Sequence, residues 1–252
     1  MVILLEQKSK LKHRNDCMIC GQELIYFEDY KDLECMYCHN IFKSNVTCLE
    51  GHFVCDGCHS LDAIGLIENY CKETDKTNPM EMAIELMKSP SINMHGPEHH
   101  FLVPAVLLTS YYNLLNEKVT KTKKLVVAKM RAKDIKGGFC GFYGNCGAAV
   151  GTGMYVSIIT GATPLTKETW GLANLMTGTA LLRMAKIGGP RCCKRNLFTA
   201  IEEAAKFTEE HFNVRLYDYE NYHPVCSFKS KNRECLRTEC PYFMASNGGY
   251  NE

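Results

Sequence analysis

The sequence predicts a mainly α-helical domain preceded by a small zinc-binding module of the zinc-ribbon or cross-braced kind. Three observations predict it. Cysteines gather in C-x2-C pairs within the first 60 residues. Beyond them, apolar residues recur at helical spacing, and prolines and glycines mark the ends of the helices. Few later stretches resemble strands, so we assign residues 1–62 to the module and 63–252 to the helical domain.

The composition favours a protein with reduced, metal-binding cysteines. The chain has 252 residues, of which 46% are hydrophobic, enough for one medium domain beside a small one. Its formal net charge of +1 excludes a general polyanion binder. It has fifteen cysteines, and its first twelve residues lack the apolar run of a signal peptide. We therefore expect a cytoplasmic protein in which cysteines bind metal or react.

One uncharged stretch needs to be distinguished from a membrane span. Gly137–Thr166 contains no charged residue and no histidine, but eight of its thirty residues are glycine. Its densest apolar part, Ala148–Ile159, is shorter than the roughly 20 residues that a span needs. We predict buried backbone here and no contact with a membrane.

The predicted module supplies enough ligands for two zinc ions. Two C-x2-C pairs separated by fourteen residues match the spacing of paired zinc knuckles, in which each tight turn presents two thiolates. Four more soft ligands follow, and His39 and His59 are spare. The eight predicted ligands are Cys17, Cys20, Cys35, Cys38, Cys48, His52, Cys55 and Cys58.

Two pairings of these ligands fit the spacing. Sequential pairing joins the first four ligands and the last four. Interleaved pairing joins Cys17 and Cys20 with Cys48 and His52, as in cross-braced RING-like fingers, and Gly51–Phe53 adds to that likeness. Three residues separate Cys48 from His52 where one is usual, which weakens a ubiquitin-ligase interpretation. Zinc with a purely structural role is the favoured interpretation, because four filled positions leave none open for catalysis.

Local signals place five helices in the larger domain. Asn78–Pro79 opens one, which Ser89–Pro90 closes. A second is expected over Pro104–Asn116 and a third over Lys124–Lys136. Thr163–Pro164 opens a fourth that ends at Gly188, and the fifth begins near Cys192 and runs to Phe212. The tail from Val225 onward reads as loop.

Cys192 and Cys193 form the most informative pair outside the module. Gly189–Pro190 places them in the first turn of a helix, where free N–H groups favour negative charge. Arg191, Lys194 and Arg195 surround them, which also favours thiolate. A thiolate here could be a nucleophile, a persulfide carrier or a metal ligand. The alternative is a buried helix start with solvated basic neighbours.

Seven cysteines are expected to converge on a second metal or cluster centre. Cys240–Pro241 resembles one ligand of ferredoxin-type clusters, although the remaining spacing does not match them. An iron–sulfur cluster and a third zinc both satisfy this chemistry. The cofactor-binding residues that we predict are Cys140, Cys146, Cys192, Cys193, Cys226, Cys235 and Cys240, whereas Cys71 is isolated.

Three further patterns carry weaker signals. His95-Gly-Pro-Glu98-His99-His100 suits metal binding or proton transfer, so we place His95 and His99 with Cys192 and Cys193 as candidate catalytic residues. The glycines that recur after Cys140 allow close approach to a ligand or close helix packing. Lys118–Lys136 carries eight positive residues, either as a solvated face or as a site for nucleic acid, a phosphate-bearing cofactor or an acidic partner.

The chain resembles an uncharacterised prokaryotic family with a cysteine-rich domain of unknown function. The residues that carry this likeness are Gly189–Arg195, His95–His100 and the terminal run from Glu239 to Phe243. It covers roughly residues 80–245. Some family members are linked to radical-SAM proteins, so the resemblance implies iron–sulfur or one-carbon chemistry in an anaerobe.

We therefore expect an enzyme or enzyme accessory in sulfur, redox or methyl chemistry, acting on a small-molecule or protein partner. Its cofactors would be two zinc ions and an iron–sulfur cluster. The competing hypothesis is a zinc-dependent module that binds nucleic acid or protein without catalysis.

Overall fold

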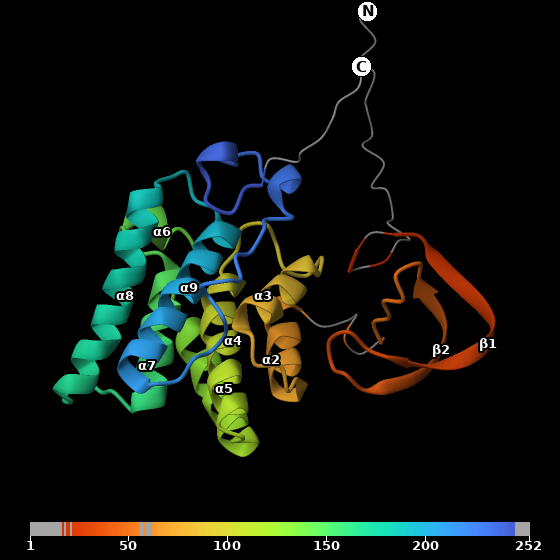
Figure 1. Ribbon diagram of the computed structural model, residues 1–252, viewed down its shortest axis with the longest axis horizontal. Coiled ribbons are helices and arrows are strands. Elements are labelled where there is room, and N and C mark those ends of the chain that lie inside the picture. The colour runs from red at the N-terminus through yellow and green to blue at the C-terminus, as the bar shows by residue number, and fades with distance from the viewer. Residues whose placement is uncertain (1–16, 18, 21, 56–57, 59–61, 245–252) are drawn as a thin grey trace, which may run out of the picture.

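The computed structural model describes residues 17, 19–20, 22–55, 58 and 62–244. Figure 1 shows two parts, a β-hairpin region and a mainly helical domain, with the hairpin on the side of α2 and α3. The predicted fold class is therefore confirmed. The described cysteine and histidine ligands of the module belong to the hairpin region, as the sequence analysis predicted.

The hairpin has little apolar core of its own. Its strands β1 (Leu24–Glu34) and β2 (Ile41–Cys48) are antiparallel, with an irregularity between Tyr26 and Lys31. Most side chains of β1 are partly or fully exposed. The described residues that this region buries are chiefly cysteines, so the ligand groups take the place of a core.

Eight helices form the described part of the larger domain, followed by two short 3-10 turns at Lys229–Lys231 and Arg237–Glu239. The helices are α2 (Ala63–Glu73), α3 (Pro79–Lys88), α4 (Glu98–Leu114), α5 (Lys118–Ala132), α6 (Phe139–Phe142), α7 (Gly147–Thr160), α8 (Glu168–Ile187) and α9 (Cys193–Phe212). α4 is buried along most of its length and packs against α2, α3, α5, α7 and α9. These five helices surround α4, which therefore lies at the centre of the domain (Figure 1).

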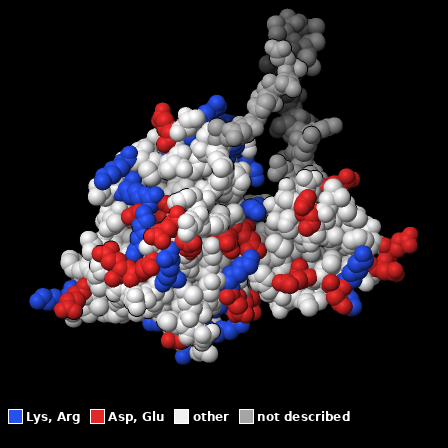
Figure 2. All heavy atoms as spheres, viewed as in Figure 1, with Lys and Arg blue, Asp and Glu red and all other residues white. Residues whose placement is uncertain are grey.

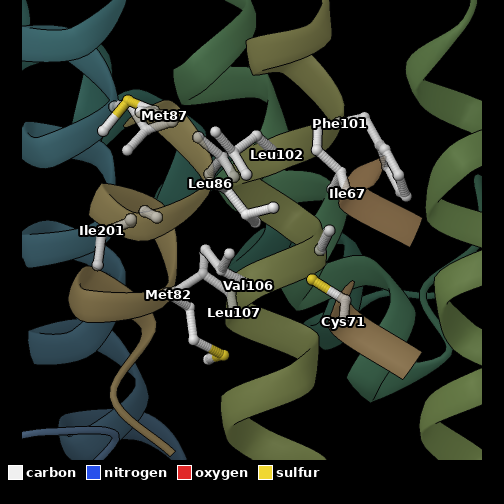
Figure 3. Close-up of a cluster of buried hydrophobic side chains, with 14 of the residues drawn as sticks. Ile67, Cys71, Met82, Leu86, Met87, Phe101, Leu102, Val106, Leu107 and Ile201 are labelled. Carbon is white, nitrogen blue, oxygen red and sulfur yellow. The ribbon is translucent and has the colours of Figure 1, made fainter. Parts of the chain in front are cut away.

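The main apolar core lies between α2, α3, α4 and α9. Figure 3 shows Met82 and Leu86 of α3 facing Val106 of α4, with Ile201 beside them. Cys71 points into the same core and is fully buried. Burial also raises the pKa of Cys71 to about 12, so this thiol is a packing residue.

Four helix ends are as the sequence predicted. The Asn78 side chain accepts hydrogen bonds from the first turn of α3, and Ser89 follows its last residue. α8 ends at Ile187 before Gly188, and Cys192 is the N-cap of α9.

Three predicted boundaries are wrong. α4 begins at Glu98, directly after Pro97, and not at Pro104 as predicted. Pro104 lies inside the helix. α5 covers Lys118–Ala132 instead of Lys124–Lys136, since its exposed polar start carries no apolar periodicity. α8 begins at Glu168, after a turn at residues 163–166.

The uncharged glycine-rich stretch forms α6 and α7. α7 is largely buried and packs against α4 and α8. Within the described residues, no helix is long and apolar enough to cross a membrane. The glycines of α7 serve close helix packing, one of the two roles that the sequence left open: a Cβ at Gly151 would lie 2.9 Å from Pro104 Cδ.

We expect Gly153→Ala to destabilise the protein by about 1–3 kcal/mol, the usual cost of overpacking. A Cβ at Gly153 would lie 2.7 Å from the carbonyl oxygen of Ala173 and would collide with Thr177. Gly178→Ala is the matched control on the facing helix, since its Cβ meets no atom within 4 Å. Urea unfolding measures both changes. Equal stability of Gly153→Ala and wild type would contradict the packing.

Candidate metal centres and the cysteine cavity

The hairpin region brings its eight predicted ligands into two groups of four. One group is Cys17, Cys20, Cys48 and His52, and the other is Cys35, Cys38, Cys55 and Cys58. Within each group the ligand atoms all lie within 4.8 Å of one another. The fold therefore adopts the interleaved pairing and not the sequential one. These groups are consistent with two metal sites.

The spacing of the ligand atoms matches a single tetrahedral ion in each group. The sulfurs of Cys20 and Cys48 are 3.7 Å apart, and those of Cys38 and Cys55 are 3.9 Å apart. Bonds of 2.3 Å in a tetrahedron place sulfurs about 3.8 Å apart, as for zinc. His52 Nδ1 lies 3.4 Å from the sulfur of Cys48. Zinc thus fits both groups in size and in ligand type.

Backbone and side-chain donors support the thiolates. The N–H of Ile19 donates to Cys17 Sγ at 3.4 Å, and the N–H of Cys55 donates to Cys35 Sγ at 3.4 Å. Asn69 of α2 donates to Cys58 Sγ at 3.6 Å, which ties the hairpin region to the helical domain. Burial, and secondarily the charge of Cys35, raise the pKa of Cys58. A metal must therefore displace a tightly held proton there.

Of the two spare histidines, His39 is not part of either group. His39 has a positive φ of 55°, and its Nδ1 lies 2.8 Å from Glu34 Oε1. His59 lies outside the described residues.

Four of the remaining cysteines line one small cavity at the start of α9. They are Cys192, Cys226, Cys235 and Cys240. Aromatic side chains, among them Phe198, Phe228 and Tyr242, line the same cavity. Burial raises the pKa of Cys226, and the charges of the other three thiols raise it further. These four thiols are therefore close enough to influence one another.

Hydrogen bonds from the tail to α9 hold this arrangement. Cys192 caps α9, where its sulfur accepts the N–H of Arg195 at 3.5 Å. The tail folds back so that the N–H of Cys226 donates to the carbonyl of Tyr242 at 2.9 Å. The Tyr242 hydroxyl in turn donates to Glu202 Oε2 at 3.0 Å and lies 3.1 Å from the Thr199 hydroxyl. Both partners belong to α9, so this tyrosine anchors the tail over Cys192.

The spacing of these thiols differs from that in the hairpin region. Among the described cysteines, only the two groups in the hairpin region place three or more ligand atoms within 4.8 Å of one another. A single zinc ion needs sulfurs about 3.8 Å apart. In an iron–sulfur cluster the four thiolates are shared among two or four iron atoms, so they do not all surround one ion. The four thiols of the cysteine cavity do not have the single-ion spacing.

The other three cysteines of the predicted centre lie elsewhere. Cys140 and Cys146 line a separate cleft between α6, α8 and the starts of α7 and α9. Cys193 lies near both regions. Burial raises the pKa of its thiol, and the charges of Cys146 and Cys192 raise it further, which shows that both thiols are nearby. The seven cysteines are therefore divided between the cavity, the cleft and a position near both.

Two of the three basic residues beside Cys192 and Cys193 are buried, whereas Arg191 is exposed. Lys194 is 1% exposed and Arg195 is 4% exposed. Burial lowers the pKa of Lys194 to about 8. Burial also raises the pKa of Cys193 to about 11, so the protein environment outweighs the helix start and the basic neighbours that we expected to favour a thiolate there.

His95 and His99 both lie beside the cysteine cavity. His95 Nε2 is 3.2 Å from Asn232 Oδ1, and Asn232 lines the cavity. His99 Nδ1 lies 3.0 Å from the carbonyl of Gly96, so this nitrogen carries the proton. Its Nε2 then accepts from Lys194 Nζ, which is 3.2 Å away. Each histidine thus contacts a neighbour of the cavity: His95 contacts Asn232, and His99 contacts Lys194, whose Nζ lies 5.1 Å from the ring centre of Phe228. Their catalytic roles remain predictions.

We expect His99 to make stability fall at low pH. Burial and the charge of Lys194 lower the pKa of His99 to about 3 in the folded chain, against about 6.5 when unfolded. The unfolded chain therefore binds a proton that the folded chain does not, so stability is lost as pH falls below 6.5. The loss reaches about 2 kcal/mol at pH 5. Urea unfolding at pH 7.5 and 5 should show a smaller loss in His99→Gln, and equal losses in both proteins would contradict this.

Several lysines of the predicted nucleic-acid segment have partners within the protein. Lys121 is fully buried and donates to the carbonyl of Thr74 at 2.8 Å, and Lys129 pairs with Glu68. On the face shown in Figure 2, acidic and basic residues are interspersed over the helical domain. Binding of nucleic acid through Lys118–Lys136 remains a prediction.

Some residues of these sites give no signal in the sequence. Two asparagines donate hydrogen bonds to cysteine sulfurs, Asn69 to Cys58 and Asn196 to Cys146. Two other residues, Asn232 and Tyr242, line the cysteine cavity, and Asn232 contacts the distant His95. No local spacing marks an asparagine or a tyrosine as a partner of a thiol. Only the tertiary fold identifies them.

Comparison with known proteins gives one family match. Neither a curated protein nor a solved structure matches this chain. A model of a family of unknown function, DUF5714, matches residues 67–243. The match covers most of the chain, including the cysteine cavity and the adjacent cleft, but not the hairpin region. This cysteine-rich chain therefore belongs to the DUF5714 family.

Proposed function

We propose that this chain is a zinc-stabilised iron–sulfur protein of the cytoplasm that acts in sulfur, redox or methyl chemistry, as an enzyme or as an accessory to one. Two zinc ions would occupy the ligand groups of the hairpin region. An iron–sulfur cluster would be held by Cys192, Cys226, Cys235 and Cys240. The family likeness described above, which implies iron–sulfur or one-carbon chemistry, agrees with this proposal.

One observation carries the proposal: four cysteines from two distant segments line one cavity. Cys192 is the N-cap of α9, whereas the other three belong to the tail beyond residue 225. A four-cysteine set is the usual ligand set of both two-iron and four-iron clusters. The lack of single-ion spacing among these thiols favours a cluster over a third zinc ion.

The surroundings also suit a cluster. Phe198, Phe228 and Tyr242 give the cavity apolar walls that limit access of water. Lys194 and Arg195 place positive charge beside Cys192. Burial raises the pKa of Cys240, and the charge of Arg195 opposes that rise. A cluster with four thiolates is an anion, so buried positive charge favours its binding. When bound, such a group would supply one-electron chemistry next to the buried network of His99 and Lys194.

The absorbance spectrum of anaerobically purified protein tests the proposal. We expect a brown protein with a charge-transfer band near 400 nm, as thiolate-bound clusters show. Cys226→Ser should lose most of this band, because Cys226 lines the cavity. Cys140→Ser is the matched control, since Cys140 lines the separate cleft and should keep the band. A colourless wild-type protein that contains only zinc would overturn the proposal.

A further inference from the structure

The cleft beside the cysteine cavity has the dimensions of a ligand site. It has a volume of about 660 Å³, within the range of small-molecule pockets. Its walls come from α6, the start of α7, the end of α8 and the start of α9. Arg195 lines both the cleft and the cysteine cavity, so the two are neighbours.

Two thiols face this cleft, and one of them is held in a fixed direction. Cys146 caps α7, and its sulfur accepts a hydrogen bond from Asn196 Nδ2 at 3.3 Å. The loop from Phe139 to Asn145 closes on itself, since the N–H of Asn145 donates to the carbonyl of Phe139 at 3.1 Å. Cys140 and Cys146 each follow one partner of that bond. The backbone therefore brings Cys140 and Cys146 near each other at the two ends of this segment, and both line the cleft.

The charge of the cleft favours an anionic ligand. Arg191 and Arg195 line it, and none of the described lining residues is acidic. The Arg195 guanidinium donates to the carbonyls of Gly188 and Pro190, at 2.9 and 2.8 Å. These bonds fix its positive charge at the cleft without involving a carboxylate. Phe142 is 88% exposed at the rim, where its ring offers contact to an apolar part of a ligand.

We infer that this cleft binds a small anionic disulfide and that Cys146 and Cys140 reduce it by thiol–disulfide exchange. The sulfur of Cys146 attacks one sulfur of the substrate, whose S–S bond breaks and releases one thiolate. The sulfur of Cys140 then attacks Cys146 in the mixed disulfide and releases the second thiolate. Two protein thiols become one disulfide, and their two protons end on the two product thiols.

Cys193 is the expected bystander of this exchange. It lies near Cys146, but it is half-buried and does not line the cleft. A ligand in the cleft therefore reaches Cys146 and Cys140 but not Cys193.

The test incubates the full-length anaerobic protein with oxidised glutathione, an anionic disulfide, and with cystamine, a cationic one. Acid quenching, alkylation and peptide mass spectrometry identify the modified cysteines. We expect wild type to form a Cys140–Cys146 disulfide, Cys140→Ser to accumulate glutathione on Cys146, and Cys146→Ser to form neither. Cys193→Ser should behave as wild type.

The charge requirement is tested in the same experiment. Oxidised glutathione should react at least about tenfold faster than cystamine, and Arg191→Gln should remove most of that preference. Absence of modification at Cys146, or equal rates with both disulfides, would overturn the assignment. Iron analysis of the same samples separates this outcome from the proposed cluster. Loss of iron in Cys140→Ser or Cys146→Ser would also overturn it, because these cysteines would then be ligands.

Discussion

Removing zinc should unfold the hairpin region and leave the helical domain folded. The described residues buried in that region are chiefly the ligands themselves, whereas α2, α3, α4 and α9 share an apolar core. Structural zinc contributes about 10–16 kcal/mol to small modules of this kind. A strong chelator should therefore abolish amide protection in β1 and β2 while the helical circular-dichroism signal changes little.

Zinc addition is the control for this experiment, because it should restore the protection of β1 and β2. Asn69 is the described side chain of α2 that donates to a ligand sulfur, Cys58. Asn69→Ala should therefore weaken zinc binding about tenfold or more in the second ligand group and not in the first. Persistence of protected strands after complete zinc removal would contradict a structural role for the metal.

Replacing Cys192 should release both the cluster and the tail. In Cys192→Ala, one of the four thiols is lost at the N-cap of α9. The three tail cysteines then have no anchor through the cluster, so the segment over residues 226–243 should exchange its amides at least about tenfold faster. Hydrogen exchange followed by mass spectrometry measures this change, and iron analysis measures the loss of the cluster.

Tyr242→Phe is the control for Cys192→Ala, because it changes a contact of the tail without removing a cysteine. It removes the hydroxyl that contacts Glu202 and Thr199 but no thiol. We expect it to cost about 1–3 kcal/mol, because Glu202 and Thr199 are buried, and to retain iron. Equal exchange in wild type and Cys192→Ala would show that the tail is held without the cluster.

Local spacing predicted the two parts of the fold but not their internal arrangement. Three C-x2-C pairs identified six ligands of the hairpin region, and the spacing of Cys48 and His52 identified the other two. This spacing allowed two pairings, because both give four ligands for each metal. β1 and β2 decide between them, since pairing of Leu24 with Cys48 brings Cys48 and His52 beside Cys17 and Cys20. Such a choice depends on strand register, which the spacing does not contain.

The second centre shows the same limit. The sequence predicted seven converging cysteines, and the structure divides them between a cavity and a cleft. Cys192 and Cys226 are separated by the whole of α9 and by the segment over residues 213–225, so no local pattern predicts that they lie close together. Burial of Lys194 was also unpredictable, because a lysine beside a helix start is usually solvated. Gly147, Gly151 and Gly153 weakened the helical signal of α7.

Metal and sulfide analysis of the anaerobic wild-type protein is the most direct test of the cluster. We expect about two zinc ions per chain, together with iron and acid-labile sulfide in equal amounts, either two or four of each. The iron should disappear in Cys192→Ser and remain in Cys140→Ser, because these thiols line different sites. Three zinc ions, or zinc without sulfide, would contradict a cluster at Cys192, Cys226, Cys235 and Cys240.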